Sequence, residues 1–143
     1  MEIHYADAGT TQAHIQRFFD QYDEQVLGHK LEIEKHSDQL VLQAIREEKV
    51  VAGLIAKKLF DSLHLSELAV KLNHRKEGIG TRLMNEMEDW ARQKGVHVIT
   101  ISTESYQAQA FYEKFGYQEF GRLKDMPFKG VEKIYLVKYL ESR

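Results

Sequence analysis

Residues 75–81 read Arg-Lys-Glu-Gly-Ile-Gly-Thr, and this stretch decides the fold because it joins an apolar run to an amphipathic helix. A turn that contains glycine and opens a helix leaves several backbone N–H groups without partners, all directed into the same space. The helix N-terminus carries partial positive charge, and Arg75 and Lys76 add two cations beside it. These features indicate a binding site for a phosphate-bearing cofactor.

Gly78 and Gly80 do not complete either of the common phosphate-binding motifs. A dinucleotide-binding motif needs a third glycine three residues after Gly80, where Leu83 stands, and an acidic residue about 20 residues later, where a strand-like run has none. A nucleoside-triphosphate loop needs Gly-Lys followed by Ser or Thr, and the chain has no such tripeptide. Taken alone, the turn also fits a glycine-containing helix start that binds no ligand.

The elements on either side of the turn predict a mixed sheet. Residues 63–71 before it and 96–102 after the helix read as strands, and the second is rich in β-branched residues. The helix between them, 78–94, carries one apolar stripe and ends at Gly95. Because a strand–helix–strand connection normally makes its two strands parallel, these two strands should be parallel.

The remaining elements predict an α+β fold. Short polar turns between successive strands favour antiparallel hairpins. The expected elements are a strand at 1–5, a helix at 11–27 ended by Gly28, a loop at 29–37, strands at 39–45 and 50–60, a helix at 106–115 ended by Gly116, and strands at 117–124 and 131–140. We therefore expect a single domain, 1–143, whose sheet has about seven strands, mostly antiparallel with a central parallel pair.

Composition argues against several classes of protein. A net charge of −2 argues against a nucleic-acid binder, which usually carries a basic surplus. Without Cys there is no thiolate nucleophile, and the seven His residues lack the spacing of a metal motif, so no metal is expected. No apolar run approaches the roughly 20 residues that span a bilayer, and no signal peptide is visible. We expect a cytoplasmic protein with no nucleic-acid or membrane partner.

A second motif occupies residues 105–117, which read Ser-Tyr-Gln-Ala-Gln-Ala-Phe-Tyr-Glu-Lys-Phe-Gly-Tyr. Together with residues 75–81, it resembles the GNAT superfamily of N-acetyltransferases. The central signature of that family is Arg or Gln, two residues, Gly, one residue, then Gly or Ala, and Arg75, Gly78 and Gly80 match it in full. The later signature is commonly Asn-x-x-Ala-x-x-x-Tyr followed by Glu-Lys-x-Gly-Phe or Gly-Tyr. Here the matching residues are Ala108, Tyr112, Glu113, Lys114, Gly116 and Tyr117, whereas Ser105 stands where Asn is usual.

The resemblance implies that acetyl-coenzyme A binds where the two central strands splay apart, as in the GNAT fold. The pyrophosphate would lie on the N–H groups of residues 76–81, and the pantetheine arm would pair like an added strand near Leu68 and Val70. A Cβ at Gly78 or Gly80 would hold the phosphate away from the backbone. The implied cofactor-binding residues are Leu68, Ala69, Val70, Arg75, Lys76, Glu77, Gly78, Ile79, Gly80, Thr81, Ser105, Ala108 and Tyr112.

The implied reaction is direct acyl transfer, in which a neutral amine attacks the thioester and a thiolate leaves. Tyr112 is the family's candidate acid. A phenol, with a pKa of about 10, is close enough in pKa to a thiol, at about 8.5, to donate a proton to the departing thiolate, and it is not ionised at neutral pH. Core packing is the alternative for Tyr112, because its helix has an apolar face. Glu67 is the candidate base because it interrupts an apolar strand face; a salt-bridged or exposed glutamate is the alternative.

The sequence leaves the acceptor open. A small amine, an amino acid, a polyamine, an aminoglycoside or a protein terminus would each supply a primary amine, and the acyl group could be acetyl or longer. The loop at 29–37 contains both acids and bases, so it does not indicate the acceptor's charge. A non-catalytic acyl-CoA-binding sensor module is the main alternative, and a nucleotide-binding protein is the third. Homodimers are frequent in the resembled family, which makes a homodimer an expectation.

Overall fold

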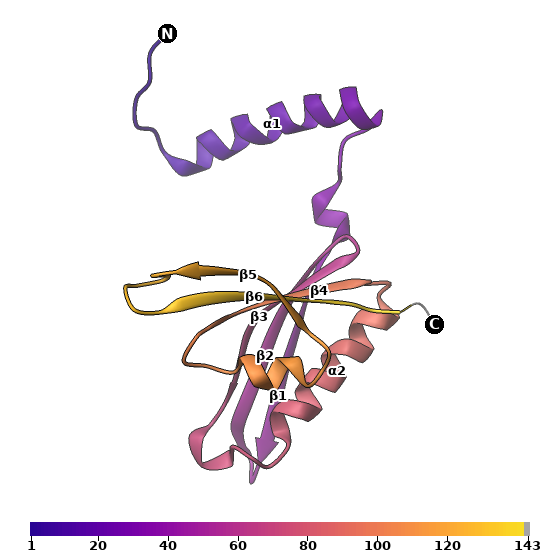
Figure 1. The fold of residues 1–143 in the computed structure, drawn as a ribbon. Helices are drawn as coiled ribbons and strands as arrows, with labels where there is room; N and C mark the ends of the chain where they lie inside the picture. The colour runs from indigo at the N-terminus through magenta and orange to yellow at the C-terminus, as the bar shows by residue number, and fades with distance from the viewer. Residues whose placement is uncertain (142–143) are drawn as a thin grey trace. The chain divides into compact units, whose positions relative to one another are not determined.

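The computed structural model describes residues 1–141, which form two units divided after Lys35 (Figure 1). The first unit contains one long helix, α1 (Ala8–Leu27). The Asp7 carboxylate caps its start by accepting the Thr10 N–H at 2.9 Å, and Gly28 ends it with a φ of 84°. The predicted helix at 11–27 and its glycine stop are therefore confirmed, and the helix begins three residues earlier than expected because of the Asp7 cap.

Residues 1–7 carry no regular secondary structure, so the predicted strand at 1–5 was wrong. A strand requires the backbone of a neighbouring strand as its partner, and no described strand pairs with this segment. Alternation of apolar and polar residues over five positions does not supply such a partner. Within residues 1–141 the sheet consequently has six strands rather than about seven.

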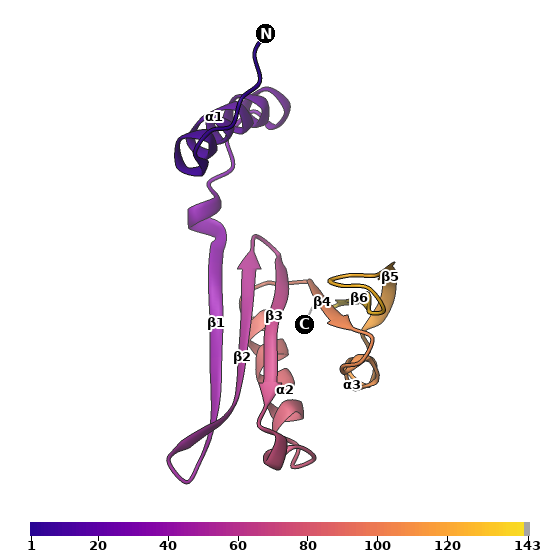
Figure 2. The same cartoon turned by 90° about the vertical axis from the view of Figure 1, so that its left-hand side faces the viewer.

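The second unit is built on one mixed sheet with the strand order β1-β2-β3-β4-β6-β5 (Figures 1 and 2). β3 and β4 are parallel, and every other neighbouring pair is antiparallel, which confirms the predicted central parallel pair. The strands are β1 (Ser37–Arg46), β2 (Lys49–Leu59), β3 (Ser62–Val70), β4 (Val98–Glu104), β5 (Gln118–Lys124) and β6 (Glu132–Tyr139).

Two helices position the site in this unit. α2 (Ile79–Gln93) lies along the sheet and contacts β1, β2 and β3 (Figure 2). Most of its predicted apolar stripe is buried, including Ile79, Leu83, Met84 and Met87. α3 (Gln109–Glu113) is shorter than the predicted helix at 106–115. Two 3₁₀ turns, η1 (Ile33–His36) and η2 (Leu72–His74), complete the elements. None of the helices in residues 1–141 is both long and apolar enough to cross a bilayer.

β3 and β4 pair over only part of their lengths. The parallel ladder joins Ser62–Leu65 to Val98–Ile101 and then stops, although both strands continue. A bulge lies where the pairing ends: β2 residues Ile55 and Ala56 face Glu67 and Leu65, which leaves Ser66 as the extra residue on β3. A bulge bends its strand, so β3 turns away from β4 beyond this point.

Candidate functional site

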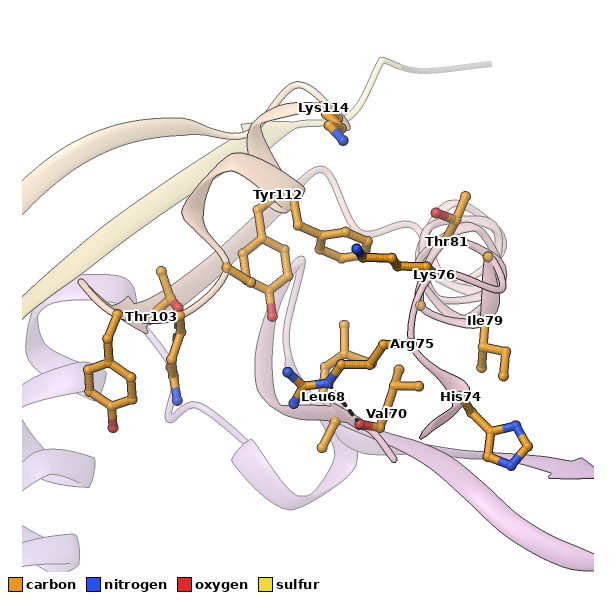
Figure 3. A pocket seen from close by; sticks show the side chains of 17 residues that line it. Leu68, Val70, His74, Arg75, Lys76, Ile79, Thr81, Thr103, Tyr112 and Lys114 are labelled. Carbon is orange, nitrogen blue, oxygen red and sulfur yellow. Dashed lines mark hydrogen bonds between the residues drawn. The ribbon is translucent and has the colours of Figure 1, made fainter. Parts of the chain in front are cut away.

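A pocket of about 810 Å³ lies where β3 and β4 diverge (Figure 3). Its lining comes from the end of β3, the turn into α2, the end of β4 and α3. Most of the predicted cofactor residues meet there, although they are far apart in the sequence. Those that line the pocket are Leu68, Ala69, Val70, Arg75, Lys76, Gly78, Ile79, Gly80, Thr81, Ala108 and Tyr112, whereas Glu67, Glu77 and Ser105 do not line it.

The turn before α2 presents free backbone donors to this pocket. The first helical bond is donated by the Arg82 N–H to the Gly78 carbonyl at 3.1 Å, and no side chain caps the helix. The N–H groups of residues 78–81 therefore have no hydrogen-bond acceptor within the described part of the chain. Four such donors at a helix N-terminus favour an anion, as the sequence predicted.

The two glycines of the turn are required for different reasons. Gly78 has a φ of 79°, in the left-handed region that strains any L side chain, and no protein atom lies within 4 Å of a Cβ placed there. At Gly80 a Cβ would lie 3.2 Å from the tip of the Phe111 ring. Gly80 thus permits close packing of α3 on the start of α2, a role that the sequence did not indicate.

Basic side chains surround the turn. Arg75 folds back along β3, and its Nε donates to the Val70 carbonyl at 3.3 Å (Figure 3). His74 lies beside the turn with its Nδ1 3.0 Å from a Glu77 carboxylate oxygen, so Glu77 pairs with a neighbour rather than facing the pocket. Lys76 also lines the pocket. The charge around the donors is therefore mainly positive.

Tyr112 projects from α3 with its hydroxyl directed into the pocket (Figure 3). The residue is 8% exposed, and its ring meets Phe111 and Tyr117 edge-on, with centroid separations of 5.3 and 6.5 Å. Burial raises the pKa of Tyr112 above its usual value, because the phenolate would lose its hydration. The hydroxyl therefore remains protonated at neutral pH and can donate a proton.

Glu67 does not lie on the strand face that the sequence indicated. Leu63 and Leu65 are buried before the bulge, and Leu68 and Val70 are half-buried after it, so the extra residue shifts the alternation and leaves Glu67 exposed. The premise that Glu67 interrupts an apolar face was therefore wrong. A bulge carries no reliable local signal, which is why simple alternation failed here.

His64 lies on the same exposed side of β3. Its Nδ1 is hydrogen-bonded to the Thr100 hydroxyl at 2.9 Å. Burial, and then the positive charge of Lys133, lower the pKa of His64, so the imidazole is neutral at pH 7. Across residues 1–141, no three potential ligand side chains gather where they could hold a metal ion.

Ser105 is bound to the sheet. Its N–H donates to the Glu132 carbonyl at 2.8 Å, and its hydroxyl accepts the Glu132 N–H at 3.1 Å. Sequence reasoning missed several neighbours that do line the pocket. These are Thr103, Tyr106, Gln107, Phe111 and Lys114, of which all but Thr103 lie within the second motif.

Comparison with known proteins agrees with this geometry. Residues 6–117 match the model of the acetyltransferase (GNAT) family. The blasticidin-S acetyltransferase of Streptomyces morookaense is 31% identical over 93 residues, which cover 64% of this chain and 68% of that protein. The N-acetyltransferase family 8 member 3 of Mus musculus is 36% identical over 70 residues, 48% of this chain and only 30% of that protein. The chain thus matches less than a third of the length of the mouse protein.

Solved structures share the fold. An acetyltransferase from Bacillus cereus ATCC 14579 superposes with a TM-score of 0.81 and 29% identity, over 97% of this chain and 98% of the other. A putative streptothricin acetyltransferase from Bacillus anthracis str. Ames, in complex with acetyl coenzyme A, has a TM-score of 0.65 and 21% identity, over 72% and 63% of the two chains. The six-stranded mixed sheet with one parallel pair is that of the GNAT fold.

Proposed function

This chain belongs to the acetyltransferase (GNAT) family, and we propose that it transfers an acetyl group from acetyl-coenzyme A directly to the primary amine of an acceptor. One observation carries the proposal. A single pocket contains both the unpaired N–H groups of residues 78–81 and the buried hydroxyl of Tyr112. The first feature suits a diphosphate and the second suits a departing thiolate.

The turn would hold the diphosphate. The donors of residues 78–81 are fixed by the helix, so they need no rearrangement to bind an anion, and Arg75 and Lys76 add charge. The related fold from Bacillus anthracis is described in complex with acetyl coenzyme A, which supports the same ligand here. Acetyl-coenzyme A supplies an activated acyl group as a thioester.

The end of β3 would hold the pantetheine arm. Beyond Leu65, β3 has no partner on its β4 side among the described residues, because the parallel ladder ends there. Leu68 and Val70 line the pocket from this unpaired stretch. An amide-containing arm can pair with such a strand through main-chain hydrogen bonds. A backbone N–H near Leu68 would also polarise the thioester carbonyl.

Tyr112 would protonate the leaving group. In the proposed step a bond forms between the amine nitrogen and the acetyl carbon, the carbon–sulfur bond breaks, and the thiolate takes the proton of the Tyr112 hydroxyl. Tyr112 is buried and keeps its proton at neutral pH, as such a donor must. Glu67, on the exposed side of β3, would accept the amine's proton through a relaying water.

A thiol-release assay tests the proposal. Acetyl-coenzyme A is incubated with the protein and a panel of amines that includes blasticidin S, an aminoglycoside, polyamines, amino acids and peptides with free N-termini. We expect turnover with at least one amine, together with calorimetric binding of acetyl-coenzyme A in the absence of any acceptor. Binding without turnover for every amine would contradict the transferase proposal and favour the sensor module.

Three further expectations belong to the proposal. The protein would be one cytoplasmic domain, it would form a homodimer, and it would need no nucleic acid or membrane as a partner. Light scattering coupled to size-exclusion chromatography measures the assembly directly. A mass equal to that of the 16.7 kDa chain across the concentration range would contradict the homodimer.

A further inference from the structure

α2 carries a buried carboxylate that the proposed reaction does not use. Glu88 is 5% exposed, although it lies in the middle of the apolar stripe of the helix. One of its oxygens accepts the Tyr117 hydroxyl at 2.9 Å, and the other accepts the Lys138 ammonium at 2.8 Å. A buried charge is costly unless it is paired and hydrogen-bonded, and Glu88 is both.

The hydrogen bond from Tyr117 ties α2 to the segment that carries Tyr112. Tyr117 is 2% exposed and lies four residues beyond the end of α3. Successive turn bonds make this connection rigid: the Phe115 N–H donates to the Tyr112 carbonyl at 3.0 Å, and the Gly116 N–H donates to the Glu113 carbonyl at 3.0 Å. The Tyr117 ring also meets the Tyr112 ring edge-on, with an interplanar angle of 74°.

α3 requires such external support. It has only five residues, and an isolated helix of about one turn is unstable in water because nucleation is unfavourable. Two contacts with α2 hold it: Phe111 packs against Gly80 on the side toward the turn, and Tyr117 binds Glu88 on the other. The packing of Phe111 fixes how closely α3 approaches α2, and the hydrogen bond of Tyr117 fixes the C-terminal end of α3.

We propose that Glu88 is a positioning residue for the acid of the transfer reaction: its hydrogen bond to Tyr117 holds the Tyr112 hydroxyl at the place of the leaving sulfur. The inference rests on the proposed function. A displacement of about 1 Å at a reacting group can cost up to a hundredfold in rate. Glu88 itself touches neither substrate nor pocket, so its effect on catalysis passes through Tyr117 and Tyr112.

The positive charges around Glu88 stabilise the carboxylate that accepts the Tyr117 hydroxyl. Lys138 pairs with the carboxylate, and Arg92 lies 3.7 Å from it on the same helix. Burial, reinforced by the neighbouring Glu88 carboxylate, raises the pKa of Tyr117, so its hydroxyl keeps the proton that it donates to Glu88 at neutral pH.

The test is a double-mutant cycle. Tyr117→Phe removes only the hydroxyl and keeps the ring packing, and Glu88→Met keeps the length of the side chain and removes the oxygen that accepts this hydrogen bond. We expect each to lower kcat about tenfold, while the Kd for acetyl-coenzyme A changes less than about twofold. In a Tyr112→Phe background neither substitution should lower kcat further, because the hydroxyl that they position is gone. Tyr139→Phe, at a residue that is 73% exposed, is the matched control and should leave kcat unchanged.

The outcomes separate this inference from the proposed function. If Tyr112→Phe lowers kcat but Tyr117→Phe and Glu88→Met do not, the positioning role is overturned and the transferase proposal stands. Equal losses in the wild-type and Tyr112→Phe backgrounds would indicate a general structural effect and would also overturn it. No effect of Tyr112→Phe would remove Tyr112 from the mechanism, and the positioning role with it. If Tyr117→Phe fails to fold, the Glu88→Met arm of the cycle decides by the same criteria.

Discussion

Phe111 of α3 lies so close to Gly80 of α2 that a Cβ on Gly80 would come within 3.2 Å of the ring. This contact fixes the distance between the helix that binds the diphosphate in our proposal and the helix that carries Tyr112. The shape of a pocket between two helices depends on that distance. The tightness of the contact can be tested by adding one methyl group at position 80.

Gly80→Ala should destabilise the protein by about 1 kcal/mol. Overpacking of a well-filled contact costs about 1–3 kcal/mol, against about 1 kcal/mol gained when Ala replaces Gly in a helix. Urea unfolding measures the difference. In a Phe111→Leu background Gly80→Ala should instead raise the free energy of unfolding, since the ring tip is absent and only the helix preference of Ala over Gly remains. A stabilising Gly80→Ala in the wild type would show that the ring yields without cost.

Gly78→Ala should weaken the binding of acetyl-coenzyme A as well as stability. The left-handed backbone costs a side chain about 1–2 kcal/mol, and the added Cβ projects into open space beside the donors. Gly95→Ala is a matched control, because Gly95 has a φ of 76° and equally open surroundings away from the pocket. Calorimetry should show weaker binding for Gly78→Ala alone. Equal affinity of the two variants would contradict a ligand at the turn.

Tyr112→Phe should lower kcat by about a hundredfold while the binding of acetyl-coenzyme A survives, since general-acid catalysis typically contributes that much. The pH dependence gives an independent measurement. Tyr112 is active when protonated, and burial raises its pKa, so the wild-type rate should fall with rising pH only above about pH 10. The variant should lack this decline. An unchanged kcat would show that Tyr112 serves only in packing.

Glu67→Gln should lower kcat/KM for the amine about tenfold or more, because the group that accepts the amine's proton in the proposed step is lost. His64→Gln is the informative comparison, because His64 lies on the same exposed side of β3 and is neutral at pH 7. If His64→Gln lowers kcat/KM and Glu67→Gln does not, the base is His64. If neither variant changes kcat/KM, the amine loses its proton to solvent.

Local sequence signals predicted the turn at 75–81 but not the features that depend on pairing between strands. The turn at 75–81 was recognisable because a left-handed glycine and a helix start are properties of a few adjacent residues. The side of β3 on which Glu67 lies was not recognisable, because the bulge at Ser66 is defined by the register between β3 and β2. The same limit explains the wrong strand at 1–5, since partners for strands come from distant sequence.

Glu88 shows why a contact that supports the candidate site escaped sequence reasoning. In the sequence it is one acid within an apolar stripe, a position that could equally be a solvated edge of the helix. Its partners, Tyr117 and Lys138, lie 29 and 50 residues away. Only the packed fold brings a carboxylate, a phenol and an ammonium together. Long-range pairs of this kind leave no periodic pattern in a single chain.

The shared carboxylate of Glu88 also restricts how this protein can diverge. Loss of the acid alone would leave the partly buried ammonium of Lys138 without its partner, and loss of Lys138 alone would leave a buried anion with less compensation. Positions 88, 117 and 138 should therefore change together among descendants of this chain: a homologue with an apolar side chain at 88 should carry an uncharged one at 138 and Phe at 117.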